Sequence, residues 1–200
     1  MIKLLLATNN QGKITELHSL LSGLDLELIT PADLELTLQV KETGDSYQEN
    51  AILKSETFAK ATNLWSLADD SGLEVEALDG APGLYSARYA PQPEAGDQDR
   101  RRFLLQNLEG KPCPWNAAFQ CVVALCGPEG SIIIKAGTCP GTIIPEERGT
   151  GGFGYDPIFQ LEDLQLTMAE LPLAKKNTLS HRARAVQKLI PILQELASRA

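Results

Sequence analysis

The sequence predicts an α/β protein with a central mixed sheet flanked by helices, and three observations carry that prediction. The chain opens with an apolar run, a polar loop and an amphipathic stretch, which together are the start of an α/β unit. Two β-rich runs separated by a Gly-Pro-Glu-Gly loop indicate an antiparallel hairpin. A final stretch with apolar residues at helical spacing indicates a C-terminal helix.

Hydrophobic spacing predicts the elements of the first half. Short apolar runs after Met1 and after Leu24 are typical of buried strands, and the leucines between them recur at helical spacing. Ser46 and Glu49 form a capping box, which predicts the start of another helix. The expected elements are a strand over 3–7, a helix over 12–24, a strand over 26–30 and a helix over 47–62.

The second half continues the alternation. A buried strand over 65–68 is expected to end at Asp69-Asp70-Ser71-Gly72, and a half-exposed strand is expected over 73–77. The remaining elements are a helix over 97–108, hairpin strands over 117–125 and 131–137, an extension over 142–144, a glycine-dense loop over 149–154 and a C-terminal helix bent at Pro191. The sequence has no internal repeat or low-complexity linker, so residues 1–200 are interpreted as one domain, with two lobes around a cleft.

Composition and charge narrow the classes of function. Hydrophobic residues make up 43% of the chain and charged residues 22%, which is ordinary for a folded domain. The formal net charge of -8 argues against duplex nucleic acid as a partner, because backbone binding needs a basic face. A small anionic substrate stays possible, since a bound divalent cation inverts the local field. No apolar run approaches the roughly 18 residues of a membrane helix.

The cysteines and the N-terminus predict the compartment. The apolar run after Met1 is too short for a signal peptide. The four cysteines form no Cys-x-x-Cys pair, and a chain of this length without secretion is not expected to need disulfides. We therefore expect buried, reduced thiols in a cytoplasmic protein.

A polar loop between the first strand and the first helix is a candidate anion site. Residues 8–13 offer amide side chains, backbone N–H groups, the positive end of a helix and the charge of Lys13. The loop is not a P-loop, because the required glycine and Lys-Ser/Thr pattern is absent. On this segment alone, a polar turn without a ligand explains the residues at least as well.

Carboxylates gather in two further segments. Asp69 and Asp70 follow a buried strand, where α/β folds bind ligands, and a cation would offset the cost of burying them. Because neighbouring side chains of a strand point to opposite faces, only one of the two is expected to contact a given metal. Glu42 adds a possible oxygen ligand and Lys54 a charge within reach of phosphate, a set that suits Mg²⁺. Taken singly, each segment also fits an exposed turn.

Residues 149–157 combine a glycine-dense loop with two aromatic side chains. The glycines let the backbone approach a ligand closely. Phe153 or Tyr155 is a candidate for stacking on a base, and Asp156 for a hydrogen bond to the base edge. A hairpin-like loop that packs its aromatic rings on the core is the alternative.

Basic side chains gather near the start of the last helix. Ser180 is a candidate N-cap, with Lys176 before it and His181 and Arg182 after it. Positive charge at a helix N-terminus is unfavourable unless an anion or a carbonyl-rich base docks there, and Arg182 can donate bidentately. His18 falls off the apolar stripe of its helix and is interpreted as a surface residue.

Taken together and in this order, the segments resemble the inosine triphosphate pyrophosphatase family, whose members hydrolyse the noncanonical purine nucleotides ITP, dITP and XTP. The resemblance covers essentially the whole chain, and the ordered set is far more specific than any one segment. Its motifs are residues 8–13, 42–44, 49–51 with Lys54, 69–73, 80–83, 85–89, 151–157, and Lys176 with 180–182. The segments 91–99 and 111–115 contribute nothing to it.

The resemblance implies an elongated α/β fold of two lobes with a nucleotide cleft between them, a homodimer, and Mg²⁺ as cofactor. It implies Glu42 and Asp70 as magnesium ligands, Asp70 also as proton acceptor, and assistance from Asp69. The residues it implies for the triphosphate are Thr8, Asn9, Asn10, Gln11, Gly12 and Lys13. Those it implies for other nucleotide contacts are Lys54, Ser71, Phe153, Gly154, Tyr155, Asp156, Lys176, His181 and Arg182.

The expected chemistry is attack of an activated water between the α and β phosphates, in which positioning and charge neutralisation dominate. Arg182 is expected to donate to the 6-oxo group of hypoxanthine or xanthine, where adenine carries a donor instead. One alternative is a related pyrophosphatase for pyrimidine or modified triphosphates. The other is a non-catalytic nucleotide-binding module, which the carboxylates disfavour because without a cation they would repel triphosphate.

Overall fold

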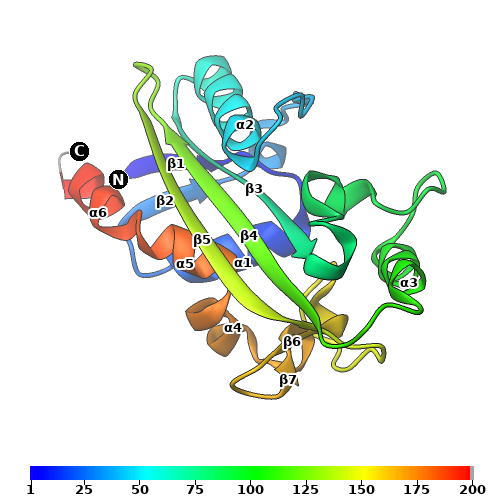
Figure 1. The fold of residues 1–200 in the computed structure, drawn as a ribbon. Helices are drawn as coiled ribbons and strands as arrows, with labels where there is room; N and C mark the ends of the chain where they lie inside the picture. The colour runs from blue at the N-terminus through cyan, green and yellow to red at the C-terminus, as the bar shows by residue number, and fades with distance from the viewer. Residues whose placement is uncertain (199–200) are drawn as a thin grey trace. The chain divides into compact units, whose positions relative to one another are not determined.

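The computed structural model describes residues 1–198, which form two compact units. Unit 1 consists of residues 1–70, 121–137 and the C-terminal segment from 181, and unit 2 consists of residues 71–120 and 138–180. Seven strands are hydrogen-bonded in the order β2-β1-β3-β4-β5-β6-β7 (Figure 1). The sheet is mixed, because β1 runs parallel to β2 and β3 while β6 runs antiparallel to β5 and β7. The predicted α/β class with a mixed sheet is confirmed.

The elements have the following bounds. The strands are β1 (Ile2–Leu6), β2 (Leu26–Ile29), β3 (Trp65–Val75), β4 (Trp115–Cys126), β5 (Ile132–Ile143), β6 (Phe159–Leu161) and β7 (Leu166–Thr167). The α-helices are α1 (Gln11–Leu21), α2 (Tyr47–Thr62), α3 (Asp97–Leu108), α4 (Leu173–Leu179), α5 (His181–Gln187) and α6 (Ile190–Ser198). Short 3₁₀ helices are η1 (Ala32–Leu34), η2 (Glu76–Leu78), η3 (Gly83–Arg88), η4 (Asp156–Ile158) and η5 (Met168–Glu170).

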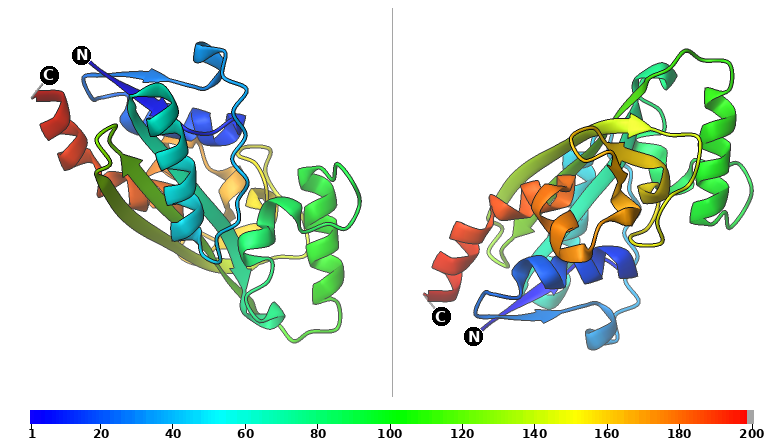
Figure 2. Two further views of the ribbon diagram at one scale, coloured as in Figure 1. Left: turned by 90° about the horizontal axis from the view of Figure 1, so that it is seen from above. Right: turned by 90° about the horizontal axis from the view of Figure 1, so that it is seen from below.

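In unit 1, the alternation of side chains along the strands decides which helices cover which face. Leu4 and Leu6 of β1 belong to an apolar cluster with α1, α5 and α6, whereas Leu5 packs in a second cluster with Phe58 of α2. Figure 1 shows α2 on one side of β1 and α1 on the other, and the two views of Figure 2 agree. Each such buried side chain stabilises the fold by about 1.5–3 kcal/mol, so both faces of the strands are anchored.

Unit 2 has its own apolar core. Phe119 of β4 and Phe159 of β6 are central to it, with ring centroids 4.4 Å apart. Leu104 and Leu108 are four residues apart on α3, so they share one helix face and bury it in the same core. The predicted helix over 97–108 is therefore confirmed, and its apolar face is explained.

The prediction that a strand ends at Asp69 is wrong, because β3 runs without a break from Trp65 to Val75. Aspartate has a low strand propensity, but tertiary contacts override it here. Asp69 and Asp70 are both buried and both paired with cations, so neither needs the solvent of a turn. The alternative interpretation of residues 69–72 as an exposed turn is therefore also wrong.

Two helix ends differ from expectation. Ser46 caps α2 as predicted, but the Glu49 carboxylate accepts its hydrogen bond from the backbone N–H of Asp45 at 2.7 Å rather than from Ser46. Ser180 is the C-cap residue of α4 and also directly precedes α5, so it occupies the predicted N-cap position. The helix that follows is not one long helix bent at Pro191, because the chain forms two helices, α5 and α6, with Pro191 in the first turn of α6.

Two predictions from composition can be checked directly. Among residues 1–198, no helix is long and apolar enough to cross a membrane. The four cysteines are free, and Cys121, Cys126 and Cys139 are buried as expected. Cys113 is exposed, which corrects the expectation that every thiol is buried.

Candidate functional site

The loop between β1 and α1 presents the N-terminus of a helix to solvent. Asn10 caps α1, because its Oδ1 accepts a hydrogen bond from the backbone N–H of Lys13 at 3.0 Å. Thr8 Oγ1 accepts from the backbone N–H of Asn10 at 3.2 Å and fixes the turn before the helix. Within the described residues of α1, the first turn contains no acidic side chain. The positive end of the helix therefore faces solvent in a form that suits an anion.

On the side of β3 that faces α1 and α5, Asp69 lies in a buried network of charges. Its Oδ2 is 3.0 Å from Lys13 Nζ and accepts from Arg182 Nε at 3.2 Å and from Arg182 Nη2 at 3.0 Å. Arg182 also pairs through Nη1 with Glu16 of α1. Arg182 is 1% exposed and Asp69 2%. This network joins α1, β3 and α5 by charged hydrogen bonds.

The pKa values follow from these contacts. Burial by itself raises the pKa of the Asp69 carboxyl, but Lys13 and Arg182 hold it well below its usual range. Burial likewise opposes the charge of Arg182, and the carboxylates of Asp69 and Glu16 raise its pKa nonetheless. Asp69 and Arg182 are therefore both ionised at neutral pH, and each neutralises the other.

On the opposite side of the same strand, Asp70 faces α2. Its Oδ1 accepts from Lys54 Nζ at 3.2 Å, and its Oδ2 accepts from Asn50 Nδ2 at 3.2 Å. Lys54 Nζ also donates to Glu42 Oε1 at 2.7 Å. Burial outweighs the nearby cations and raises the pKa of the Asp70 carboxyl above its ordinary value. The pKa of Lys54 is raised too, because nearby carboxylates, Asp70 foremost, outweigh its burial.

Asn50 ties the Glu42 segment to β3. Its Oδ1 accepts from the backbone N–H of Gly44 at 2.8 Å, while its amide nitrogen donates to Asp70. A Cβ on Gly44 would lie 2.6 Å from the Glu49 Cβ, so a larger residue does not fit without a shift. This close approach explains the glycine after Glu42 and brings the Glu42 carboxylate to Lys54.

The charges of this cluster suit a divalent cation. Glu42 and Asp70 share one ammonium group, that of Lys54, so the three groups together carry an excess of negative charge. Residues 1–198 hold no group of three or more His, Cys, Asp or Glu side chains arranged for a metal ion. Mg²⁺ does not require one, because it typically uses one or two carboxylates together with water and substrate phosphates. The donor set of Glu42 and Asp70 therefore fits Mg²⁺ bound with a phosphate.

In unit 2, the glycine loop is folded over the side chain of Asp156. Gly152 and Gly154 have φ of 71° and 62°, in the left-handed region that favours glycine. A Cβ on Gly152 would lie 2.0 Å from Asp156 Oδ2. That oxygen accepts from the backbone N–H of Phe153 at 2.8 Å and pairs with Lys176 Nζ. The loop conformation thus depends on glycine at 152 and on the Asp156–Lys176 pair.

Phe153 and Tyr155 have different surroundings. Lys176 Nζ lies 5.1 Å from the centroid of the Phe153 ring, a cation–π contact, and Phe153 keeps part of its surface exposed. Tyr155 is buried in the core of unit 2, where its hydroxyl donates to the Ser86 carbonyl at 2.9 Å and burial raises its pKa. Of the two rings, Phe153 is the one with surface to offer a base.

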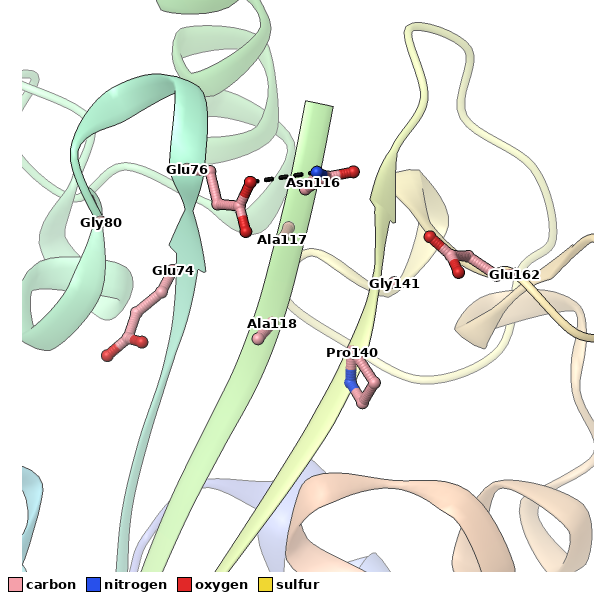
Figure 3. Close-up of a pocket in the computed structure, with 9 residues that line it drawn as sticks. All are labelled: Glu74, Glu76, Gly80, Asn116, Ala117, Ala118, Pro140, Gly141 and Glu162. Atoms are coloured by element: carbon pink, nitrogen blue, oxygen red, sulfur yellow. Dashed lines mark hydrogen bonds between the residues drawn. The ribbon is translucent and has the colours of Figure 1, made fainter. Parts of the chain in front are cut away.

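A pocket of about 420 Å³ in unit 2 has a different character. Figure 3 shows it lined by Glu74, Glu76, Gly80, Asn116, Ala117, Ala118, Pro140, Gly141 and Glu162. Glu76 accepts from Asn116 Nδ2 at 3.0 Å, and Glu74 accepts from Gln120 at 3.0 Å. Three carboxylates line the pocket without a lysine or arginine among its lining residues, and none of the residues implied for the nucleotide or the metal lines it, so it is not the candidate site.

Comparison with known proteins decides the family. Residues 4–192 match the model of the Ham1 family. This chain belongs to the Ham1 family. It is 44% identical to the dITP/XTP pyrophosphatase of Desulforamulus reducens, over 98% of this chain and 97% of the relative. It is 46% identical to the dITP/XTP pyrophosphatase of Geobacter sulfurreducens, over 94% and 95%.

Solved structures of Ham1 proteins agree with the fold. The HAM1 protein from Coxiella burnetii has a TM-score of 0.87 at 40% identity, covering 98% of this chain and 100% of that one. The Ham1 protein of Staphylococcus aureus has a TM-score of 0.84 at 41% identity, covering 96% and 98%. The resemblance to inosine triphosphate pyrophosphatases, inferred from short motifs, is confirmed at the level of the family.

The residues that the Ham1 resemblance implies fall into two groups. Unit 1 contains Thr8, Asn9, Asn10, Gln11, Gly12, Lys13, Glu42, Lys54, Asp70, His181 and Arg182. Unit 2 contains Ser71, Phe153, Gly154, Tyr155, Asp156 and Lys176. Within unit 1 the contacts join Lys13 to Asp69 and Glu42 to Lys54, and within unit 2 they join Phe153 to Asp156 and Lys176. Their roles toward a nucleotide stay predictions.

Sequence reasoning missed three residues of the Asp69 and Asp70 surroundings. Glu16 pairs with Arg182, and Cys121 Sγ lies 3.9 Å from Asp69 Oδ2. Asn50 lies in the 49–51 motif but is not among the residues assigned to the site, although it donates to Asp70. Glu16 had a usable signal, because it follows Lys13 by three residues and so lies on the same face of α1. Cys121 had none, since only the tertiary fold brings it to Asp69.

Proposed function

We propose that this chain hydrolyses the noncanonical purine nucleoside triphosphates ITP, dITP and XTP to the monophosphate and pyrophosphate, and so cleanses the nucleotide pool. The observation that carries the proposal is the Asp70 carboxylate, held by Asn50 and Lys54 beside Glu42, in a chain whose relatives over nearly its full length are named dITP/XTP pyrophosphatases. A carboxylate held in this way can accept the proton of an attacking water, a role that a binding module does not require.

The triphosphate is proposed to bind at the N-terminus of α1. Thr8, Asn9, Asn10, Gln11 and Gly12 supply backbone and side-chain donors, and the helix dipole favours the negative charge. Lys13 adds a full charge, and its ammonium group is already held in place by Asp69 at 3.0 Å. A held ammonium loses less side-chain entropy when a phosphate arrives, which strengthens binding.

Magnesium is proposed as the cofactor, with Glu42 and Asp70 as its protein ligands. The excess of carboxylates over ammonium groups around Lys54 supports this assignment. When bound, Mg²⁺ supplies neutralisation of phosphate charge and polarisation of the scissile phosphoanhydride.

Asp70 is proposed to accept the proton of the attacking water. The water oxygen forms a bond to the α phosphorus as the bond to the bridging oxygen breaks, and pyrophosphate leaves. Asn50 holds Asp70 Oδ2 by a hydrogen bond at 3.2 Å, which orients the carboxylate for that transfer. Lys54 lies between the carboxylates and offsets charge that develops on the phosphates.

The base is proposed to bind at the Phe153–Asp156 loop, with Phe153 as the stacking ring. Ser71, Gly154, Tyr155, Lys176 and His181 keep the nucleotide contacts that the family resemblance implies. Arg182 is proposed to donate to the 6-oxo group of the base. It must do so while Nε and Nη2 donate to Asp69 and Nη1 donates to Glu16.

The test is pyrophosphate release from ITP, XTP, GTP, ATP and dTTP, each with and without Mg²⁺. The proposal predicts fast release from ITP and XTP that depends on Mg²⁺, and slow release from the other three. Release mainly from dTTP would support the related pyrophosphatase for other bases. Nucleotide binding without any pyrophosphate release would support the binding module instead.

We further propose a homodimer in the cytoplasm, and the family resemblance alone supports both. Light scattering on the purified protein tests the dimer, which predicts twice the chain mass of 21.7 kDa. A mass of 21.7 kDa at micromolar concentration would contradict it. Fractionation of the source cells tests the location.

A further inference from the structure

Helix α3 makes two hydrogen bonds to the backbone of the glycine loop, both at Gly154. Asp97 Oδ2 accepts from the backbone N–H of Gly154 at 2.7 Å, and Arg101 Nη1 donates to the carbonyl of the same residue at 2.8 Å. Asp97 and Arg101 are four residues apart, so they project from one face of the helix. Both hydrogen-bonding groups of Gly154 are thereby held by a single rigid element.

The side chains of Asp97 and Arg101 are fixed by further ion pairs. Arg101 makes a bidentate pair with Glu147, Nε to Oε1 and Nη2 to Oε2, both at 2.9 Å. The other oxygen of Asp97 pairs with Arg100, whose Nη1 donates to the carbonyls of Ala87 at 3.2 Å and Ala95 at 2.5 Å. The start of α3, from Asp97 to Arg101, therefore holds η3 and the segments 91–96 and 147–154 together.

The ionisation of Asp97 strengthens its hydrogen bond with the backbone N–H of Gly154. Partial burial alone raises its pKa, but the N–H of Gly154 and the guanidinium of Arg100 hold the pKa below its ordinary value. The acceptor is thus a carboxylate at neutral pH, and charge-assisted hydrogen bonds are roughly twice as strong as neutral ones.

Gly154 lies between the residues on which base recognition is proposed to depend. Phe153 precedes it and Tyr155 follows it, and Gly154, with φ of 62°, has no side chain to restrict its backbone. A loop of this kind keeps one conformation only if its backbone is held from outside. The Asp156–Lys176 pair holds the loop from one end, and α3 holds it at its centre.

We propose that Asp97 and Arg101 are positioning residues of the reaction, which hold the Phe153–Gly154 backbone in the conformation that binds and discriminates the purine base. The proposal rests on the proposed function, and it concerns the base end of the substrate only. Neither residue is among those proposed to bind the phosphates, so their loss should raise KM and weaken base preference while kcat at saturating substrate changes little.

The experiment compares Asp97→Ala and Arg101→Met with the unmodified protein in pyrophosphate release from XTP, ITP and GTP. Losing one charge-assisted contact is expected to raise KM for XTP about tenfold and to narrow the preference for XTP over GTP by a similar factor. Asp97→Asn keeps an oxygen that accepts from Gly154 but loses the charge, so it should recover part of the loss. Arg102→Met is the matched control, because Arg102 lies on the same helix with its side chain 62% exposed.

The outcomes separate this inference from the function on which it rests. An unmodified protein that releases no pyrophosphate from ITP or XTP overturns both. An active protein whose Asp97→Ala and Arg101→Met variants keep the KM and the base preference overturns the positioning role alone. A fall in kcat with unchanged KM, or an Asp97→Asn variant as impaired as Asp97→Ala, also overturns it. Arg101→Lys, which keeps the charge near Glu147, serves if Arg101→Met does not fold.

Discussion

Asp69 and Asp70 are adjacent in the chain, yet the two faces of β3 give their carboxylates different surroundings. Asp69 meets Lys13 and Arg182, and Glu16 completes a cluster of two carboxylates and two cations. Asp70 shares the ammonium of Lys54 with Glu42, a cluster of two carboxylates and one cation. The first cluster balances its charge, and the second carries an excess of one negative charge.

The comparison teaches how one short motif supplies two different functions. Side chains of a strand alternate between its faces, so adjacent identical residues enter different electrostatic environments. The pKa of Asp69 is lowered by its cations, whereas the pKa of Asp70 is raised by burial. Under the proposed function, Asp69 stabilises the fold and holds Lys13, and Asp70 takes part in the chemistry.

The largest expected effect is that of Asp70→Asn on turnover. The amide cannot accept the proton of the attacking water and is a poor ligand for Mg²⁺, so kcat is expected to fall about 10⁴-fold. Pyrophosphate release from XTP measures it. The melting temperature should not fall, because burial disfavours the charge that the substitution removes.

Asp69→Asn is the matched control for that variant, being the same change one residue away. It removes the anion shared by Lys13 and Arg182, so it should lower the melting temperature clearly. Turnover measured well below that temperature should fall far less than in Asp70→Asn. Equal losses of turnover in the two variants would contradict the assignment of the chemistry to Asp70 alone.

The next effect concerns stability on the Asp69 side. Arg182→Met leaves the buried carboxylates of Asp69 and Glu16 without their shared guanidinium, and breaking such a pair costs about 3–5 kcal/mol. Urea unfolding of the variant measures the loss. Adding Glu16→Gln should recover part of it, since one uncompensated charge is then removed.

Arg184→Met provides the control, because Arg184 is exposed on the same helix. A surface substitution of this kind is expected to change the free energy of unfolding by less than about 0.5 kcal/mol. If Arg182→Met were as mild as this control, the Asp69 network would not be a stabilising element.

Local patterns predicted most of the fold. The helix over 47–62 and the helix over 97–108 have the expected bounds, because a cap and an apolar stripe are both encoded within one segment. The strand through Asp69 and Asp70 was missed, because its polar residues are tolerated only through cations on α1, α2 and α5. Such long-range pairing leaves no mark in a window of neighbouring residues.

The candidate site was predicted in part for the same reason. Lys13 and Lys54 stand next to recognisable segments and were singled out as phosphate groups. Asp97 and Arg101 were not singled out, because they belong to a segment without a motif, and their partner Gly154 is more than fifty residues away. The motifs identify the residues that touch substrate in the family, whereas the residues that hold those motifs require the structure.

Lys54→Met tests the charge excess on the Asp70 side. The variant removes the cation that pairs with both Glu42 and Asp70, so the cluster repels phosphate more strongly. KM for XTP is expected to rise about tenfold, the loss of roughly one charged contact. Lys60→Met on the same helix is the control, since Lys60 is exposed and pairs with Glu56 one turn away. An unchanged KM would contradict the assignment of Lys54 to the substrate site.

The smallest effect uses a thiol as a probe of the Asp69 side. Cys121 lies 3.9 Å from Asp69, and burial together with that carboxylate raises its pKa to about 12. At pH 8 the thiol is therefore protonated, and its buried sulfur is not accessible to reagents. Native protein should react with one equivalent of a thiol reagent quickly, at the exposed Cys113, and with four after unfolding.

Cys113→Ser makes the readout specific, because the native variant should then show no fast-reacting thiol. Adding Arg182→Met loosens the network around Asp69 and should make Cys121 react faster than in Cys113→Ser alone, below the temperature at which the protein melts. Faster reaction of Cys121 would thus detect local exposure of the residues around Asp69 before the protein unfolds globally. If Cys121 itself reacted quickly in the unmodified protein, solvent would already reach the carboxylate of Asp69, and the balanced charges around Asp69 could not be what distinguishes it from Asp70.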